Sequence, residues 1–284
     1  MDGLSGTRVK IMGEFEPKET FKYQLTSAIE DIIRGLRLWW LWYYLPVSEI
    51  QSRYRRTFLG PFWATISMGI FIAMIGLIYS SLWQVDISHF LPYLASGYII
   101  WILISTIINE GTMTFIQHEH IVRNTVVPFS VFPIICVVRN LMLFLHHFTV
   151  YLFVAVIFSV APGWGSLLFF PALVLVCITG FWVVLVLGIV SARFRDIPHF
   201  ISSIILILLL LTPILFEADS LRGKFSLLVD WNILYHYIEI LRAPLLGKFA
   251  SALSWIMVSA FTIFSALAGL TVYAKYRTSI IFWL

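Results

Sequence analysis

Six long runs of apolar residues decide what this chain can fold into. Five of the runs contain no Asp, Glu, Lys or Arg, and the third contains only Arg139, close to one end. At about 1.5 Å per residue, twenty helical residues cover the ~30 Å hydrocarbon core of a membrane. We therefore predict an all-α integral membrane protein with six transmembrane helices, because runs this long and continuous are not barrel strands. The runs are Pro61–Leu82, Phe90–Asn109, Phe132–Ala161, Gly165–Ala192, Ile197–Phe216 and Ala250–Ala274.

The composition excludes the soluble alternatives. Of 284 residues, 60% are hydrophobic and only 12% are charged, against about 25% charged in a soluble domain. A soluble fold cannot bury that much apolar surface, which rules out a soluble enzyme and a disordered chain. The two cysteines both lie in apolar runs and form no disulfide framework.

Lysine and arginine predict the orientation of the chain. If the N-terminus is cytoplasmic, fifteen of the 19 lie on the cytoplasmic side and four on the other. This is a strong positive-inside bias. We expect a multi-pass protein of the bacterial inner membrane with both termini in the cytoplasm.

Three segments differ from ordinary spans. One is a mostly polar stretch around Gly111–Val131, which predicts a cytoplasmic loop between the second and third spans. Residues 21–45 repeat apolar groups at helical spacing and predict an amphipathic helix on the cytoplasmic surface. On the outer side, residues 225–247 are half apolar and too interrupted to cross, which predicts a re-entrant helical segment. We expect a cytoplasmic region at 1–60, a six-span domain at 61–274 and a cytoplasmic tail at 275–284.

The chain has few candidates for catalysis. It has no G-x-x-x-x-G-K-[ST] phosphate loop, so we do not expect it to hydrolyse ATP. His118-Glu119-His120 is a poor metal motif, since residues two apart on a helix point to different faces, and a solvated loop or partner contact is the favoured interpretation. His146 and His147, inside the third span, indicate either a functional pair or histidines hydrogen-bonded to a neighbouring helix.

Arginines and aromatic residues each allow two interpretations. Arg53, Arg55 and Arg56 precede the first span, where they either anchor the chain against anionic lipid or bind a diphosphate head group. Trp and Tyr form ordinary interfacial belts in membrane proteins. A subset of them is also placed to line a path for sugars: Tyr79, Tyr93, Tyr98, Trp101 and Trp182.

Five segments, in order, resemble the ABC-2-type polysaccharide exporter permeases. The resemblance covers the chain from about Trp42 onward. The last segment and the Phe282-Trp283-Leu284 tail are most similar to the O-antigen lipopolysaccharide branch, with capsule and teichoic-acid exporters next. One departure is Ile233, where the family usually has proline after the asparagine. The segments are EIQSRYRRTFLGPFW at 49–63, FLPYLASGYIIW at 90–101, FIQHEHIVR with PFSVF at 115–132, RFRDI with Thr212-Pro213, and NILYHYIEILRAPLLG at 232–247.

The resemblance implies a transport subunit that is not itself an enzyme. Such permeases work as homodimers with two copies of a separate ATP-binding cassette subunit, which binds ATP and Mg, so this chain would carry no cofactor or metal. Their substrate is a polysaccharide linked to a polyprenyl diphosphate, moved across the inner membrane through a channel that two copies form and aromatic residues line. We expect membrane lipid as a further partner, and we do not expect nucleic acid to bind.

Site residues follow from that resemblance as hypotheses. Arg53, Arg55 and Arg56 would bind the lipid diphosphate, and the five aromatic residues would line the glycan channel. Coupling to the ATPase would involve Phe115, Glu119, Arg123, Arg34 and Arg37. The outer segment would narrow the exit through Asn232, Tyr235, His236 and Arg242.

Two alternatives stay open. An ABC-2 exporter of a drug or small lipid would share the architecture, with fewer pore aromatics. A membrane enzyme of glycan assembly, such as an acyltransferase, would need a charged catalytic cluster at an interface, and only His118–His120 hints at one.

Overall fold

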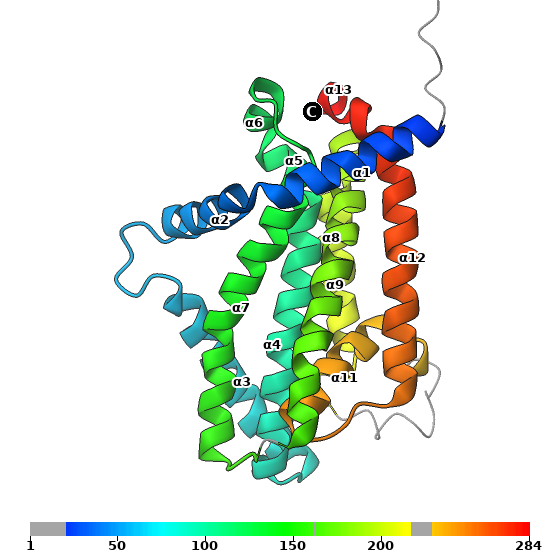
Figure 1. Cartoon of the computed structure of the whole chain (residues 1–284). Helices are drawn as coiled ribbons and strands as arrows, with labels where there is room; N and C mark the ends of the chain where they lie inside the picture. Colours follow the sequence, from blue (N-terminus) through cyan, green and yellow to red (C-terminus); the bar gives the residue numbers. More distant parts are fainter. Residues whose placement is uncertain (1–20, 162, 217–228) are drawn as a thin grey trace, which may run out of the picture.

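All regular structure in the described part of the chain is helical. The computed structural model describes residues 21–161, 163–216 and 229–284 (Figure 1). Five helices are long and apolar enough to cross a membrane, and each coincides with a predicted span. They are α3 (Phe62–Trp83), α4 (Ile87–Thr112), α7 (Val131–Ile157), α8 (Phe169–Arg193) and α12 (Ala252–Tyr276).

The remaining predicted span forms a shorter helix. α9 (Ile197–Leu211) has 15 residues, about 22 Å of helix, and ends before Thr212-Pro213. Proline restricts the residue before it to extended backbone, and Thr212 has ψ 134°. Five of the six predicted spans are therefore confirmed by length.

α4 occupies the centre of the bundle and packs against α3, α7, α8, α9 and α11. Small residues let the helices of the bundle approach one another closely. A Cβ on Gly111 would lie 2.7 Å from a methyl of Val184 on α8, and one on Gly269 of α12 would lie 2.8 Å from the Trp182 ring. Larger residues at either position would force these helices apart.

Two helices cross one end of the bundle: α1 (Phe21–Arg37) and α2 (Trp39–Arg53) (Figure 1). The sequence predicted a single helix over residues 21–45, which is wrong in one respect. The helix is interrupted at Leu38, whose ψ of 48° is not helical, and the Trp42 indole donates to the Leu36 carbonyl, at 3.1 Å. α1 and α2 are therefore separate helices joined at Leu38.

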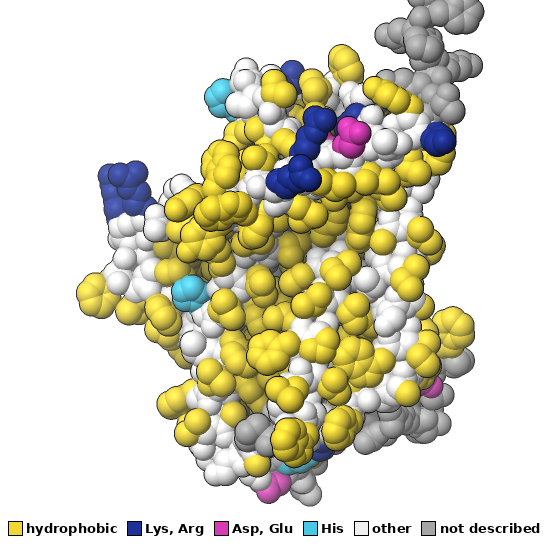
Figure 2. Space-filling model, viewed as in Figure 1, with side chains coloured by type: hydrophobic (Ala, Val, Ile, Leu, Met, Phe, Trp, Pro, Cys, Tyr) yellow, Lys and Arg dark blue, Asp and Glu magenta, His cyan; other side chains and the backbone are white. Residues whose placement is uncertain are grey.

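The same end carries three short helices, α5 (Thr114–Gln117), α6 (Glu119–Asn124) and α13 (Ile280–Trp283) (Figure 1). The predicted loop between the second and third spans is thus partly helical. Lys and Arg side chains gather mainly at this end, and the flank of the bundle is covered by apolar side chains (Figure 2).

The opposite end encloses α11 (Ile233–Leu245), which packs against α4, α8, α12 and the 3₁₀ turn η1 (Trp164–Leu168). Most of its residues are buried. The Tyr237 hydroxyl lies 2.7 Å from that of Thr179 and 3.0 Å from that of Thr262. Because each threonine is ten residues into its helix, α11 reaches about 15 Å into the bundle.

Candidate functional site

A cluster of buried charges joins three helices at the end that α1 and α2 cross. The Arg139 guanidinium of α7 is 3% exposed. It contacts the Glu49 carboxylate of α2 and lies 2.9 Å from the Glu110 carboxylate of α4. Asn140 donates to the same Glu110 oxygen, at 2.9 Å. A buried arginine needs paired acceptors, and here two carboxylates supply them.

His118 extends the cluster to the segment between α5 and α6. One ring nitrogen lies 2.8 Å from a Glu49 oxygen and the other 2.7 Å from the Thr114 carbonyl. Burial raises the pKa of Glu49, but the His118 hydrogen bond and the Arg139 charge outweigh it, so this pKa lies below its ordinary value. Glu49 is thus an ionised link between α2, α7 and the α5–α6 segment.

The structure corrects the interpretation of His118 as part of a solvated loop. Its side chain is buried, whereas Glu119 and Arg123 are exposed and form an ion pair along α6, at 2.9 Å. Among the described residues, no group of three His, Cys, Asp or Glu is placed to hold a metal ion. Both observations assign His118 to the charge cluster.

The three predicted diphosphate-binding arginines differ in their surroundings. Arg53 ends α2, is half exposed and pairs with Glu110, at 3.0 Å. Arg55 and Arg56 lie exposed in the loop that leads to α3. Neither guanidinium has a partner within the described ranges. Figure 2 shows cationic atoms protruding on the left, where Figure 1 places the loop after α2.

Asp31 fixes α1 in the way that Glu49 fixes α2. Its carboxylate accepts from the Ser130 backbone N–H, at 3.1 Å, and from the Tyr273 hydroxyl. Ser130 precedes α7 and Tyr273 is near the end of α12. Gly35 permits this contact, since a Cβ there would lie 2.4 Å from the Ser130 hydroxyl. Each surface helix is therefore anchored to the bundle by a carboxylate.

The other predicted coupling residues are divided between core and surface. Phe115 is fully buried against Phe132, with 6.2 Å between ring centroids. Arg34 is exposed and pairs with Glu30, at 3.5 Å, and Arg37 is exposed at the end of α1. Phe115 is therefore a packing residue, and the arginines remain available to a partner.

The five predicted channel aromatics do not gather on one face of a single chain. Trp101 is buried in the core. The others are half-buried: Tyr98 stacks on Phe71, at 4.7 Å, Tyr79 packs on Trp83, and Trp182 lies between α8 and α12. Tyr93 lies beneath the Arg242 guanidinium, 4.0 Å from its ring centroid.

The predicted outer residues hold α11 in place. Asn232 caps the helix: its side-chain oxygen accepts from the N–H of Leu234, at 3.0 Å, and of Tyr235, at 3.2 Å. The helix begins at Ile233, so the departure from proline leaves the cap intact. His236 is buried and bonds Ser254 and the Asp230 carbonyl.

Arg242 is the buried cation of this end. It is 2% exposed, pairs with Glu239 at 2.7 Å and donates to the Pro213 carbonyl at 3.0 Å. Its contacts tie α11 to the backbone just beyond α9. The predicted outer residues therefore position α11 against its neighbours.

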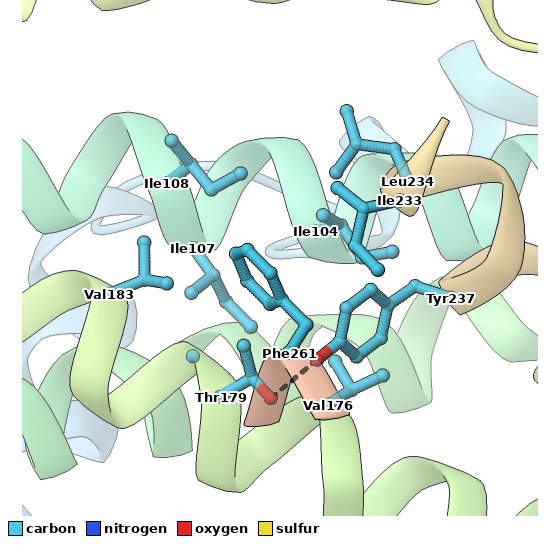
Figure 3. Close-up of a pocket in the computed structure, with 11 residues that line it drawn as sticks. Ile104, Ile107, Ile108, Val176, Thr179, Val183, Ile233, Leu234, Tyr237 and Phe261 are labelled. Atoms are coloured by element: carbon cyan, nitrogen blue, oxygen red, sulfur yellow. Dashed lines mark hydrogen bonds between the residues drawn. The ribbon is translucent and has the colours of Figure 1, made fainter. Parts of the chain in front are cut away.

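An apolar cavity of about 160 Å³ lies beside α11 (Figure 3). Isoleucine and valine side chains of α4 and α8 form its walls, with Phe261 of α12 and Tyr237 of α11. The Tyr237 hydroxyl is already bonded to Thr179 (Figure 3). The cavity therefore has too few free polar groups to hold ordered water, and its lining does not form a polar binding site.

Glu49 and Arg139 are the residues that sequence reasoning missed. A signal was present, because Arg139 is the one charge inside the six apolar runs. A charge in a membrane span requires an opposite partner at the same depth. Glu110 ends a neighbouring run at the same side and Glu49 precedes the first run, so both were candidates. His146, in contrast, bonds the Met142 carbonyl of its own helix, at 2.9 Å.

Comparison with known proteins gives one family match and several relatives. Residues 41–246 match the family described as ABC-2 type transporter. An O-antigen export system permease protein RfbA of Klebsiella pneumoniae is 25% identical over 189 residues, which is 65% of this chain and 72% of the relative. The protein of that name from Myxococcus xanthus is 26% identical over 178 residues, 62% and 68% of the two chains.

Proposed function

Because this chain belongs to the ABC-2 type transporter family, we propose that it is the membrane subunit of an ATP-driven exporter of O-antigen-type polysaccharide. The substrate would be linked to a polyprenyl diphosphate and would cross the inner membrane through a channel formed by two copies. The observation that carries this proposal is the similarity to O-antigen export permeases over about two thirds of the chain.

The proposed topology has six spans, with α9 as the fifth. Its 15 residues are short, but the irregular segment after it has its carbonyls bonded by Arg242 and Tyr93, as polar backbone at membrane depth requires. α11 would be the re-entrant element of segment 225–247, of which the described part begins at Val229. Its burial by protein on most sides supports this placement.

Both termini would be cytoplasmic, on the side of α1, α2 and α13. The concentration of Lys and Arg at that end supports the orientation. The proposed regions are a cytoplasmic part at 1–60 with the interface helices, a membrane domain at 61–274 and a tail at 275–284. Residues 1–20 of the first region lie outside the described residues.

Energy would come from two copies of a separate ATP-binding subunit, which would hold ATP and Mg. The sequence has no phosphate loop. Glu119 and Arg123 form an exposed charged ridge on α6, suited to a partner at the membrane surface. His118, next to this ridge, is hydrogen-bonded to Glu49 of α2. A movement of α6 would therefore also move α2, together with Arg53 at its end and the loop arginines after it.

The diphosphate head group would bind Arg53, Arg55 and Arg56. Guanidinium groups match phosphate oxygens in geometry and charge, and two of the three have no partner in the described structure. To bind the diphosphate, Arg53 would have to break its ion pair with Glu110 and pair with a phosphate oxygen instead. Since Glu110 also accepts from Arg139 and Asn140, it would stay paired after the exchange.

The test is to express the chain with its native operon, purify it intact and weigh the complex with its bound lipid. We expect two copies of this chain, two ATP-binding subunits and a polyprenyl-diphosphate glycan. A folded chain with no ATPase partner would contradict transport and favour a membrane enzyme. An ATPase complex that carries a drug or small lipid would retain the transporter and reject the glycan.

A further inference from the structure

A groove of about 660 Å³ runs between α3 and α7. The first half of α3 forms one wall, the last third of α7 forms the other, and only two of its lining residues are polar. Gly69 of α3 keeps it open: a Cβ there would meet only the Val150 methyls, at 3.7 Å. Space of this kind inside a membrane is filled by an apolar chain, since water has few polar partners there.

Thr65 gives the groove one unusual feature. The residue is 5% exposed and lines the groove, yet its hydroxyl has no hydrogen-bond partner in the described structure. The second polar residue, Thr149, donates to the His146 carbonyl of its own helix, at 2.6 Å. The hydroxyl oxygen has almost no accessible surface, so the groove is apolar along this wall as well.

Two cationic side chains lie near one end of the groove. Phe62 begins α3 and lines the groove, and Arg55 and Arg56 are separated from it by a few residues of loop. Their unpaired guanidinium groups fit an anionic head group. The apolar groove and the cationic loop together fit a lipid whose head is a phosphate.

Depth decides which lipid fits. On α7, Arg139 marks the level of α2, because it contacts Glu49 there. The groove wall begins ten residues further along, at Thr149, and continues to Phe158. These positions are about 15 Å and about 28 Å below α2. An acyl chain of a phospholipid whose head lies at the level of α2 covers only half of the ~30 Å core, so it would end where the groove begins.

We propose that the groove binds the isoprenoid chain of the lipid-linked substrate, with the diphosphate at Arg55 and Arg56. This proposal rests on the proposed function. A long isoprenoid reaches past the middle of the membrane, and its methyl branches suit a wall of Ile and Val side chains.

The experiment measures lipid retention by the full chain. The purified protein in phosphatidylcholine nanodiscs is titrated with undecaprenyl diphosphate, with the much shorter farnesyl diphosphate and with saturated phosphatidylglycerol, and bound lipid is counted by native mass spectrometry. The groove variant is Gly69→Leu. Its matched control is Ser67→Leu, two residues away on α3, exposed and outside the groove.

We expect Gly69→Leu to weaken the binding of undecaprenyl diphosphate about tenfold, because it removes apolar contact between the groove and the lipid chain. The binding of farnesyl diphosphate should not change. Ser67→Leu should change neither. Arg55→Gln with Arg56→Gln should weaken both probes alike. A second groove variant, Ala73→Leu, should repeat the chain-length effect, so that misfolding of one variant does not decide the result.

Three outcomes would overturn the proposal. In the first, both groove variants bind the long probe as well as the wild type does. In the second, phosphatidylglycerol competes equally, which would make the occupant ordinary membrane lipid. In the third, Gly69→Leu separates two copies of the chain instead of releasing lipid, which would assign the groove to a dimer interface. Loss of the ATPase partner would reject the proposed function and leave this binding test intact.

Discussion

The imidazole of His118 and the carboxylate of Glu49 lie 2.8 Å apart, although 69 residues separate them in the chain. This contact joins the α5–α6 segment to α2, and Arg139 on the other Glu49 oxygen joins α2 to α7. The surface helices are therefore held by specific buried groups as well as by their apolar faces.

Replacing Glu49 should release α2 from the bundle. Glu49→Ala leaves His118 without its side-chain partner and Arg139 with one carboxylate, a loss of about 1–3 kcal/mol. We expect trypsin to cleave after Arg53 and Arg55 about fivefold faster or more. Glu30→Ala is the control, since among the described residues Glu30 pairs with exposed Arg34 alone. Equal cleavage of both variants would show that Glu49 does not hold α2.

Neutral substitutions of the loop arginines should reduce export. Charge-assisted bonds to phosphate contribute about 1.5–3 kcal/mol each, so Arg53→Gln with Arg55→Gln should slow export about tenfold or more. Surface glycan and co-purification of the ATPase are the measurements, and assembly should not change. Lys248→Gln removes a cation at the opposite end and serves as control. Unchanged surface glycan in the double variant would reject head-group capture.

Exchanging the charges of the α6 ridge should uncouple ATP hydrolysis from transport. The double variant Glu119→Arg with Arg123→Glu keeps the ion pair along the helix and reverses the surface that a partner meets. Helix stability should therefore be retained, while substrate-stimulated ATPase activity falls. If stimulation survives in the exchanged variant, the ridge is not the contact with the ATPase.

Loss of the Asn232 cap should destabilise α11. Asn232→Ala removes the acceptor for two backbone N–H groups and the contact with Thr212, at 3.0 Å. The expected cost is about 1 kcal/mol, a fall in Tm of about 2–4 °C. Asn232→Ser should recover part of it, because serine also caps helices. Asn124→Ala, on exposed α6, should leave Tm unchanged, and an equal fall there would contradict a specific role for the cap.

The spans were predictable from the sequence because their signal is local. An apolar run of twenty residues has few alternatives in a membrane, and five of the six runs form long helices close to their predicted bounds. The break at Leu38 was not predictable, since the apolar periodicity of residues 21–45 continues across it. On either side of the break, Asp31 and Glu49 contact residues far away in the sequence, which is tertiary information.

The candidate site was only partly predictable for a similar reason. Arg53, Arg55 and Arg56 stand out as a cluster beside a span, but their environments differ, and only the fold places Glu110 beside Arg53. The aromatic residues in the sequence were a poorer guide to which side chains could line a channel. Trp101 and Tyr98 are three residues apart on α4, and one is buried in the core while the other stacks on α3.

In the proposed six-span topology, the shortness of α9 would affect the bilayer around it. A hydrophobic length of about 22 Å is less than the ~30 Å of a typical membrane interior, and lipid adapts to such a mismatch by thinning locally. Beyond Leu211 the chain presents carbonyls that Tyr93 and Arg242 satisfy, so polar backbone continues where other helices are still apolar. If α9 crosses the membrane as proposed, the apolar barrier would be thinnest beside it, and a hydrated sugar chain following that helix would leave water for the shortest distance.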